Sequence, residues 1–166
     1  MLIEVKVFGL AMDPVTSTPI VILKDLEGKR AIPIWIGLFE ASAIATQMEG
    51  VNLARPMTHD LMNEILKTLE VKVLKIVIND LKNNTFFASL YVMKGDLPIT
   101  IDSRPSDAIA LALRADAPIF IDEKVIEKST SIDFGKKTTD LNKYTKEQLK
   151  EFLENLSSED FGKYKM

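Results

Sequence analysis

The one histidine of the 166-residue chain, His59, is the side chain best suited to proton transfer. Its unperturbed pKa lies near neutrality, so an imidazole can both accept and donate a proton there. It stands in the run Arg55-Pro56-Met57-Thr58-His59-Asp60, directly before a helical periodicity of apolar residues. With Thr58 as N-cap, the unpaired N–H groups of the helix start would favour an anion such as phosphate. Arg55 could hold phosphate oxygens with its fork of donors.

Helix capping explains the same residues without any ligand. Thr58 and Asp60 are residues that any helix start prefers, because their oxygens accept hydrogen bonds from free backbone N–H groups. His59 could then be an ordinary surface or structural histidine. The local sequence leaves both interpretations open.

A second polar cluster, Asp102-Ser103-Arg104-Pro105-Ser106-Asp107, precedes an apolar segment that ends at Arg114. Pro105 fits the first turn of a helix, so another helix start is surrounded by an arginine, a hydroxyl and carboxylates. Asp102 and Asp107, together with Glu40 at the start of an earlier helix, could hold a divalent cation such as Mg²⁺, which prefers oxygen ligands. The alternative is that Asp107 and Arg114 only complement the helix dipole.

Composition excludes several kinds of chemistry. The chain has no cysteine, which rules out disulfides, zinc–thiolate sites and thiol nucleophiles. A single histidine rules out acid–base catalysis by a histidine pair. The sequence contains no Gly-rich phosphate loop and no HExxH motif. A net charge of −3 argues against a strongly basic nucleic-acid binder, and no stripe of aromatic and basic residues is evident.

Hydrophobic periodicity predicts the elements that must position these residues. Strands are predicted over 2–11, 20–24, 31–36, 71–79, 85–93, 99–102 and 118–121, and helices over 38–50, 58–69, 105–115 and, as one turn, 122–128. The helix over 58–69 is expected to bury a stripe formed by Leu61, Met62, Ile65, Leu66 and Leu69. Because strands do not alternate regularly with helices, we predict an α+β fold, with a mostly antiparallel or mixed sheet packed against several helices.

The chain is predicted to form one domain over residues 1–130. A linker and a C-terminal helical tail follow over 131–166, with a helix expected at 145–156. No apolar run approaches the roughly 20 residues that cross a bilayer, and the first residues lack the pattern of a signal peptide. We therefore expect no membrane association and a cytoplasmic location.

Three runs together resemble the bifunctional nuclease domain family over about residues 1–130: Ile32-Pro33-Ile34-Trp35-Ile36-Gly37 leading to Glu40-Ala41, the run containing His59, and the run from Asp102 to Ala112. The family is named for members that act on both DNA and RNA without sequence preference. The resemblance implies an α+β fold of its own type and self-association, for which we favour a dimer. It also makes DNA or RNA the expected substrate.

Within the matched motifs, our leading hypothesis is hydrolysis of phosphodiester bonds. The residues assigned to it are His59, Asp60, Asp102, Arg104 and Asp107 for catalysis; Arg55, Thr58 and Ser106 for substrate binding; and Asp102, Asp107 and Glu40 for a metal ion. One alternative is a non-enzymatic anion-binding or regulatory oligomer. Another is a structural module whose subunits meet through the apolar hairpin over 71–93.

Overall fold

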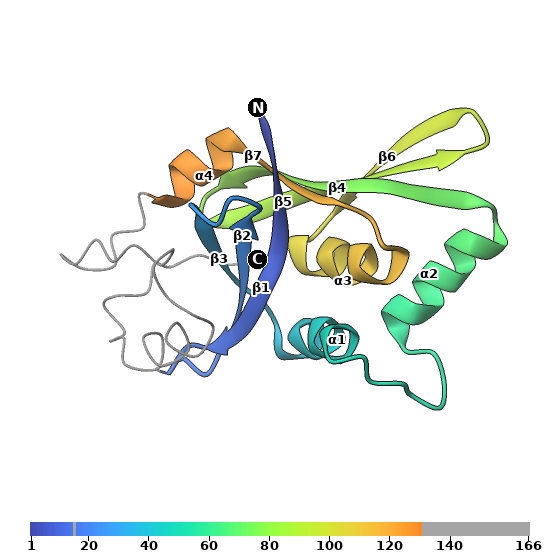
Figure 1. Ribbon diagram of the computed structural model, residues 1–166, viewed down its shortest axis with the longest axis horizontal. Helices are drawn as coiled ribbons and strands as arrows, with labels where there is room; N and C mark the ends of the chain where they lie inside the picture. Colours follow the sequence, from blue (N-terminus) through green and yellow to red (C-terminus); the bar gives the residue numbers. More distant parts are fainter. Residues whose placement is uncertain (15, 131–166) are drawn as a thin grey trace.

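The computed structural model describes residues 1–14 and 16–130, so the predicted linker and tail, including the helix over 145–156, lie outside the described residues (Figure 1). The elements are β1 (Leu2–Met12), β2 (Pro19–Asp25), β3 (Ala31–Trp35), α1 (Leu38–Met48), α2 (Thr58–Thr68), β4 (Val71–Lys82), β5 (Thr85–Lys94), β6 (Leu97–Ser103), α3 (Pro105–Ala115), β7 (Ile119–Asp122) and α4 (Glu123–Thr130). Each predicted element is present, with ends that shift by a few residues.

All seven strands form one sheet in the order β3-β2-β1-β7-β4-β5-β6. Two antiparallel meanders, β1–β3 and β4–β6, are joined by β7, which is antiparallel to β1 and parallel to β4. The predicted α+β fold with a mixed sheet is therefore confirmed. Strand β7 pairs with residues 76–78 of β4 and β6 pairs with residues 88–94 of β5, so these stretches of the β4–β5 hairpin are not free to pair with another chain.

Turn chemistry sets the register of the β4–β5 hairpin. Asn83 and Asn84 form its two-residue turn with φ angles of 48° and 60°, which asparagine tolerates better than most residues. Irregularities at Leu74 and Asn79 interrupt the ladder, and bulges of this kind increase the twist of a strand. The strands run longer than predicted because pairing continues past the apolar residues to Lys82 and Lys94.

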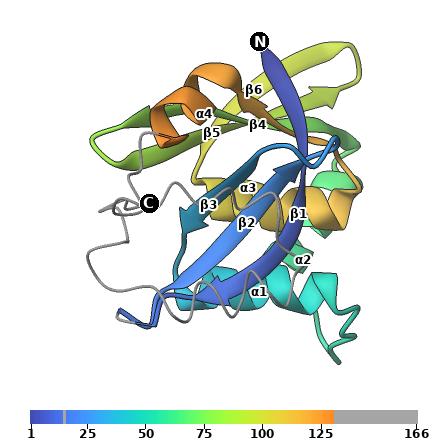
Figure 2. The same ribbon diagram turned by 60° about the vertical axis from the view of Figure 1, so that its left-hand side comes forward.

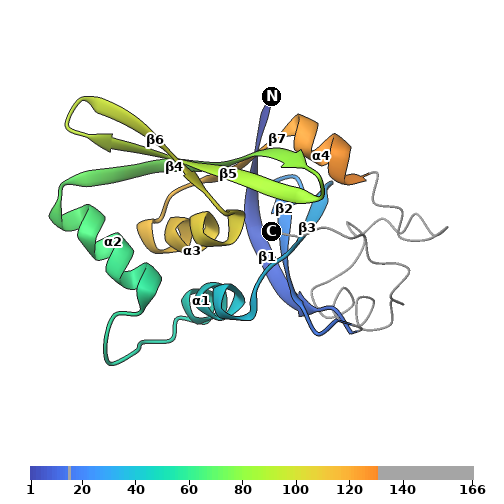
Figure 3. The same ribbon diagram turned by 180° about the vertical axis from the view of Figure 1, so that it is seen from behind.

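Helix α3 lies at the centre of the molecule, between the β4–β6 half of the sheet and α1 (Figures 1 and 3). It is apolar on nearly all sides, and its residues from Ala108 to Ala112 are fully buried. Figure 2 shows the β1–β3 meander crossing in front of α1 and α3. Helix α1 contributes small side chains to this packing: Ala41 is buried, and Ala43 packs against the core.

The prediction that α2 buries a stripe of five apolar residues is wrong for three of them. Leu61, Ile65 and Leu69 are 54%, 49% and 54% exposed, whereas the buried residues of α2 are His59 and Asn63. The helix lies at the margin of the fold and packs on α3 through its polar side, with Met62 and Leu66 partly buried beside it (Figure 3). Periodicity identifies residues that share a helix face, but it does not say which face meets the protein.

Among the described residues, none of the four helices is long and apolar enough to span a lipid bilayer.

Candidate functional site

The starts of α2 and α3 meet through a hydrogen bond between His59 and Asp107. Nε2 of His59 lies 3.0 Å from Oδ1 of Asp107, although the two residues are 48 positions apart. His59 is buried with about a tenth of its side chain exposed, and the Asp107 carboxylate is about a quarter exposed. The two polar clusters at the starts of α2 and α3 therefore lie side by side, and the pair of His59 and Asp107 joins them.

The protonation of Asp107 decides how the imidazole can act. Partial burial would by itself raise the pKa of Asp107, but hydrogen bonds from Arg104 and His59 outweigh it and lower the pKa below its ordinary value. An ionised carboxylate only accepts hydrogen bonds, so Nε2 of His59 carries the donated proton. The other ring nitrogen, Nδ1, makes no hydrogen bond within the described residues and has the lone pair of a base.

Arg104 extends the contact to α1. Its Nε donates to Oδ2 of Asp107 at 2.7 Å, and its Nη1 lies 2.8 Å from Oε1 of Glu40. About half of the Arg104 side chain is exposed, and its Nη2 has no partner among the described residues. Glu40 folds back over Gly37, so a side chain at position 37 would push the Glu40 carboxylate out of this position. We call His59, Asp107, Arg104 and Glu40 the His59 cluster.

A second ion pair ties α2 to the other end of α3. Asp60 accepts hydrogen bonds from the backbone N–H of Met57, at 2.9 Å, and from Nε of Arg114. Arg114 also donates to the carbonyl oxygens of Ala110 and Ala43, at 2.9 and 3.0 Å. Arg114 thus holds three helices together, and the carboxylate that orients His59 is Asp107.

The lowered pKa of Asp60 predicts a loss of stability in acid. The hydrogen bond from the Met57 N–H, and then that from Arg114, lowers the pKa of Asp60 below its unfolded value of about 3.9. Its stabilising contribution is complete above the unfolded pKa and disappears as the pH falls through the folded pKa. We expect the free energy of unfolding to fall less steeply below about pH 4 in Asp60→Asn than in wild type. Urea melts of both proteins from pH 6 to pH 2 measure this, and parallel slopes would contradict it.

The remaining predicted residues lie outside these contacts. Thr58 is exposed and is the first residue of α2, whose N-cap is Met57, so the prediction that Thr58 caps this helix is wrong. Arg55 is exposed in the segment before α2 and makes no ion pair with a described residue. Ser106 is completely buried, and its hydroxyl has no partner among the described residues. Roles for Arg55, Thr58 and Ser106 in substrate binding stay predictions.

The three carboxylates proposed to hold a metal are not gathered at one point. Asp102 pairs with Ser89 in the sheet, so its side chain points to the face opposite the one that carries Leu90 of the core. Glu40 and Asp107 are neighbours through Arg104, whose guanidinium lies between them. In the part of the chain that the structure describes, no three His, Asp or Glu side chains are grouped to bind a metal ion. Catalysis by Asp102 stays a prediction without a structural link to His59.

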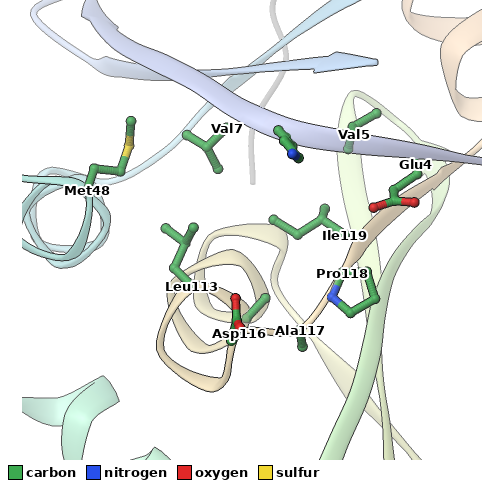
Figure 4. A pocket seen from close by; sticks show the side chains of 11 residues that line it. Glu4, Val5, Val7, Met48, Leu113, Asp116, Ala117, Pro118 and Ile119 are labelled. Atoms are coloured by element: carbon green, nitrogen blue, oxygen red, sulfur yellow. The ribbon is translucent and has the colours of Figure 1, made fainter. Parts of the chain in front are cut away.

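A cavity of about 420 Å³ opens between β1, α1, α3 and β7 (Figure 4). Apolar side chains such as Val7, Met48 and Leu113 form most of its wall, and Glu4 and Asp116 lie at its edge. The His59 cluster does not line this cavity. Two further openings, beside α2 and β4 and beside the β2–β3 turn, also lack these residues. The His59 cluster therefore lies at the surface where two helix starts meet.

Contacts between segments that are far apart in the chain could not be predicted from the sequence. The sequence predicted only that Arg114 complements the helix dipole. It gave no sign that Asn63 donates a hydrogen bond to the carbonyl oxygen of Arg114, at 3.2 Å. A further cluster surrounds Lys75. Its Nζ lies 5.0 Å from the ring centre of Tyr91 and 5.6 Å from the ring centre of Phe120. No local pattern could reveal it, because these residues come from β4, β5 and β7 and meet only in the sheet.

The fold and the His59 cluster define an α+β domain that joins a histidine–aspartate pair to an arginine where two helices begin. The chain matches the bifunctional nuclease domain over residues 21–133. It belongs to the bifunctional nuclease domain family. The resemblance found in the three sequence motifs is therefore confirmed.

Relatives from bacteria and plants agree with this membership. An uncharacterised protein of Mycobacterium tuberculosis is 36% identical over 162 residues, which are 95% of this chain and 97% of that protein. Bifunctional nuclease 2 of Oryza sativa is 30% identical over 105 residues, and bifunctional nuclease 2 of Arabidopsis thaliana is 27% identical over 107. These matches cover 61% and 62% of this chain but only 32% of each plant protein.

Proposed function

We propose that the protein is a nuclease that hydrolyses phosphodiester bonds in DNA and RNA without sequence preference, with His59 as its proton-transfer residue. The observation that carries this proposal is the hydrogen bond of 3.0 Å between His59 and Asp107, which leaves Nδ1 available as a base. Family membership and the names of the plant relatives support the reaction class. A cytoplasmic location belongs to the same proposal.

In this mechanism the imidazole accepts a proton from the attacking water or hydroxyl at Nδ1. The ionised Asp107 holds the ring in one orientation and stabilises the imidazolium that forms, as the carboxylate does in a Ser-His-Asp triad. The free Nη2 of Arg104 can donate to a phosphate oxygen and stabilise the charge that grows there. Unpaired backbone N–H groups at the starts of α2 and α3 favour the same anion.

The proposal is tested with the purified full chain on labelled single-stranded and double-stranded DNA and RNA. We expect fragments from all of these substrates and about a 10²-fold slower reaction for Asp107→Asn, which keeps the side-chain shape but loses the charge that orients His59. Parallel purifications with and without a chelator distinguish intrinsic activity from contamination and reveal any need for Mg²⁺. Equal rates for wild type and Asp107→Asn would reject the assignment.

A specific observation favours the non-enzymatic alternative of an anion-binding or regulatory oligomer. Arg104 and Arg114 both make ion pairs with carboxylates of the protein itself, and the whole chain carries a net charge of −3. On this view the His59 cluster locks three helices together. Saturable nucleic-acid binding that weakens steeply with salt, without product, would support this alternative over the nuclease.

A further inference from the structure

Helix α2 presents an uncharged apolar face to solvent. Met57, Leu61, Ile65 and Leu69 follow one another at intervals of four residues, and each is about half exposed. Thr58 and Thr68 flank them, and the charged side chains Glu64 and Lys67 pair with each other outside this stripe. A surface helix normally turns its apolar side to the core, so an apolar row exposed to solvent is unusual. We call Met57, Leu61, Ile65 and Leu69 the α2 stripe.

The region around α2 concentrates exposed apolar surface. Seven of the sixteen large hydrophobic side chains exposed in the described residues lie between Val51 and Leu74, so this surface is not evenly scattered. Contiguous apolar patches of this kind mark interaction sites in soluble proteins. The polar side of α2 is already used against α3, through His59 and Asn63. The α2 stripe is therefore available to a partner.

The spacing of the α2 stripe is symmetric about Asn63, and this symmetry identifies the partner. If two copies of α2 pack antiparallel, Leu61 of one copy lies against Ile65 of the other, and Met57 lies against Leu69. The flanking Thr58 and Thr68 meet in the same register. Rows spaced by four residues pack against each other at a crossing angle of about −50°, the commonest angle between packed helices. A twofold interface uses the same patch on both copies, as this stripe allows.

We infer that the α2 stripe is the contact surface of a homodimer with twofold symmetry. A half-exposed side chain of this size offers roughly 100 Å² of apolar area. The four residues thus provide about half of the roughly 800 Å² per partner that a standard interface buries. Val51 and Leu53, in the segment before α2, and Leu74, in β4, are exposed apolar side chains in the same part of the chain. Antiparallel α2 helices also place their dipoles in a favourable orientation.

The test is the oligomeric state of the full chain by sedimentation across a dilution series. We expect a dimer for wild type. The dissociation constant should rise by about 30-fold or more for Leu61→Glu and for Ile65→Lys, because a twofold interface would bury two copies of each unpaired charge. Leu26→Glu is the matched control, since Leu26 is 55% exposed, as Leu61 is, but lies in the β2–β3 turn. It should remain as dimeric as wild type.

Complementation tests the register. In a mixture of Leu61→Glu and Ile65→Lys chains, one contact joins Glu to Lys and the other keeps Ile against Leu, so the mixed dimer should form again. A mixture of Leu61→Glu and Ile65→Glu chains should stay monomeric, because its contacts pair like charges or leave a charge unpaired. A monomeric wild type, a dimer insensitive to Leu61→Glu, or two mixtures that behave alike would each overturn the inference.

Discussion

Removal of the imidazole is expected to give the largest loss of activity. In the proposed mechanism, His59→Ala lowers the rate of phosphodiester cleavage by about 10²–10⁴-fold, the range that a positioned general acid or base contributes. The reason is that His59 is the one histidine of the chain and the proposed mechanism moves the proton through its imidazole. Single-turnover cleavage of one labelled oligonucleotide by wild type and variant, purified in parallel, measures the ratio.

A matched variant separates chemistry from folding. His59→Gln places an amide near Nε2 that can still donate to Asp107, so the start of α2 should remain attached to α3. We expect His59→Gln to unfold at nearly the temperature of wild type and yet to be as slow as His59→Ala. The pH–rate profile of wild type should show a transition that both variants lack. A His59→Ala protein with the activity of wild type would remove His59 from the mechanism.

The sequence predicted the elements well because each has a strong local cause. The α3 boundaries followed from Pro105 at its first turn and the apolar run behind it, and the β4–β5 turn followed from Asn83-Asn84. Which carboxylate contacts His59 could not be predicted, because Asp60 is adjacent in sequence but faces Arg114, and only the packed helices bring Asp107 across.

Two further features depend on tertiary packing. The apolar residues of α2 predicted a helix correctly, but only Met62 and Leu66 of the predicted stripe pack against the core. The other three face solvent because α2 is fixed to α3 by the hydrogen bonds of His59 and Asn63. The cluster of Lys75, Tyr91 and Phe120 depends on strand order, with β7 inserted between the two meanders. Sequence patterns within single elements do not contain this order.

Loss of Arg114 is expected to give the largest loss of stability. Its side chain is only 6% exposed, and it holds Asp60 and two carbonyl oxygens from α3 and α1. Removing one partner of a buried ion pair typically costs about 3–5 kcal/mol, and Asp60 is a third exposed, so we expect about 3 kcal/mol for Arg114→Ala. For a chain of this size that lowers the unfolding temperature by roughly 6–12 °C.

Arg104→Ala is the matched comparison, because it also removes an arginine at one end of α3 that pairs with carboxylates. The Arg104 side chain is 54% exposed, so its ion pairs are screened by water and should contribute less than about 1 kcal/mol. The melting temperature should therefore fall more for Arg114→Ala than for Arg104→Ala. The cleavage rate should fall more for Arg104→Ala. Equal melting temperatures would mean that burial does not distinguish the two arginines. We would then have no basis for assigning Asp60 and Arg114 to stability and Asp107 and Arg104 to chemistry.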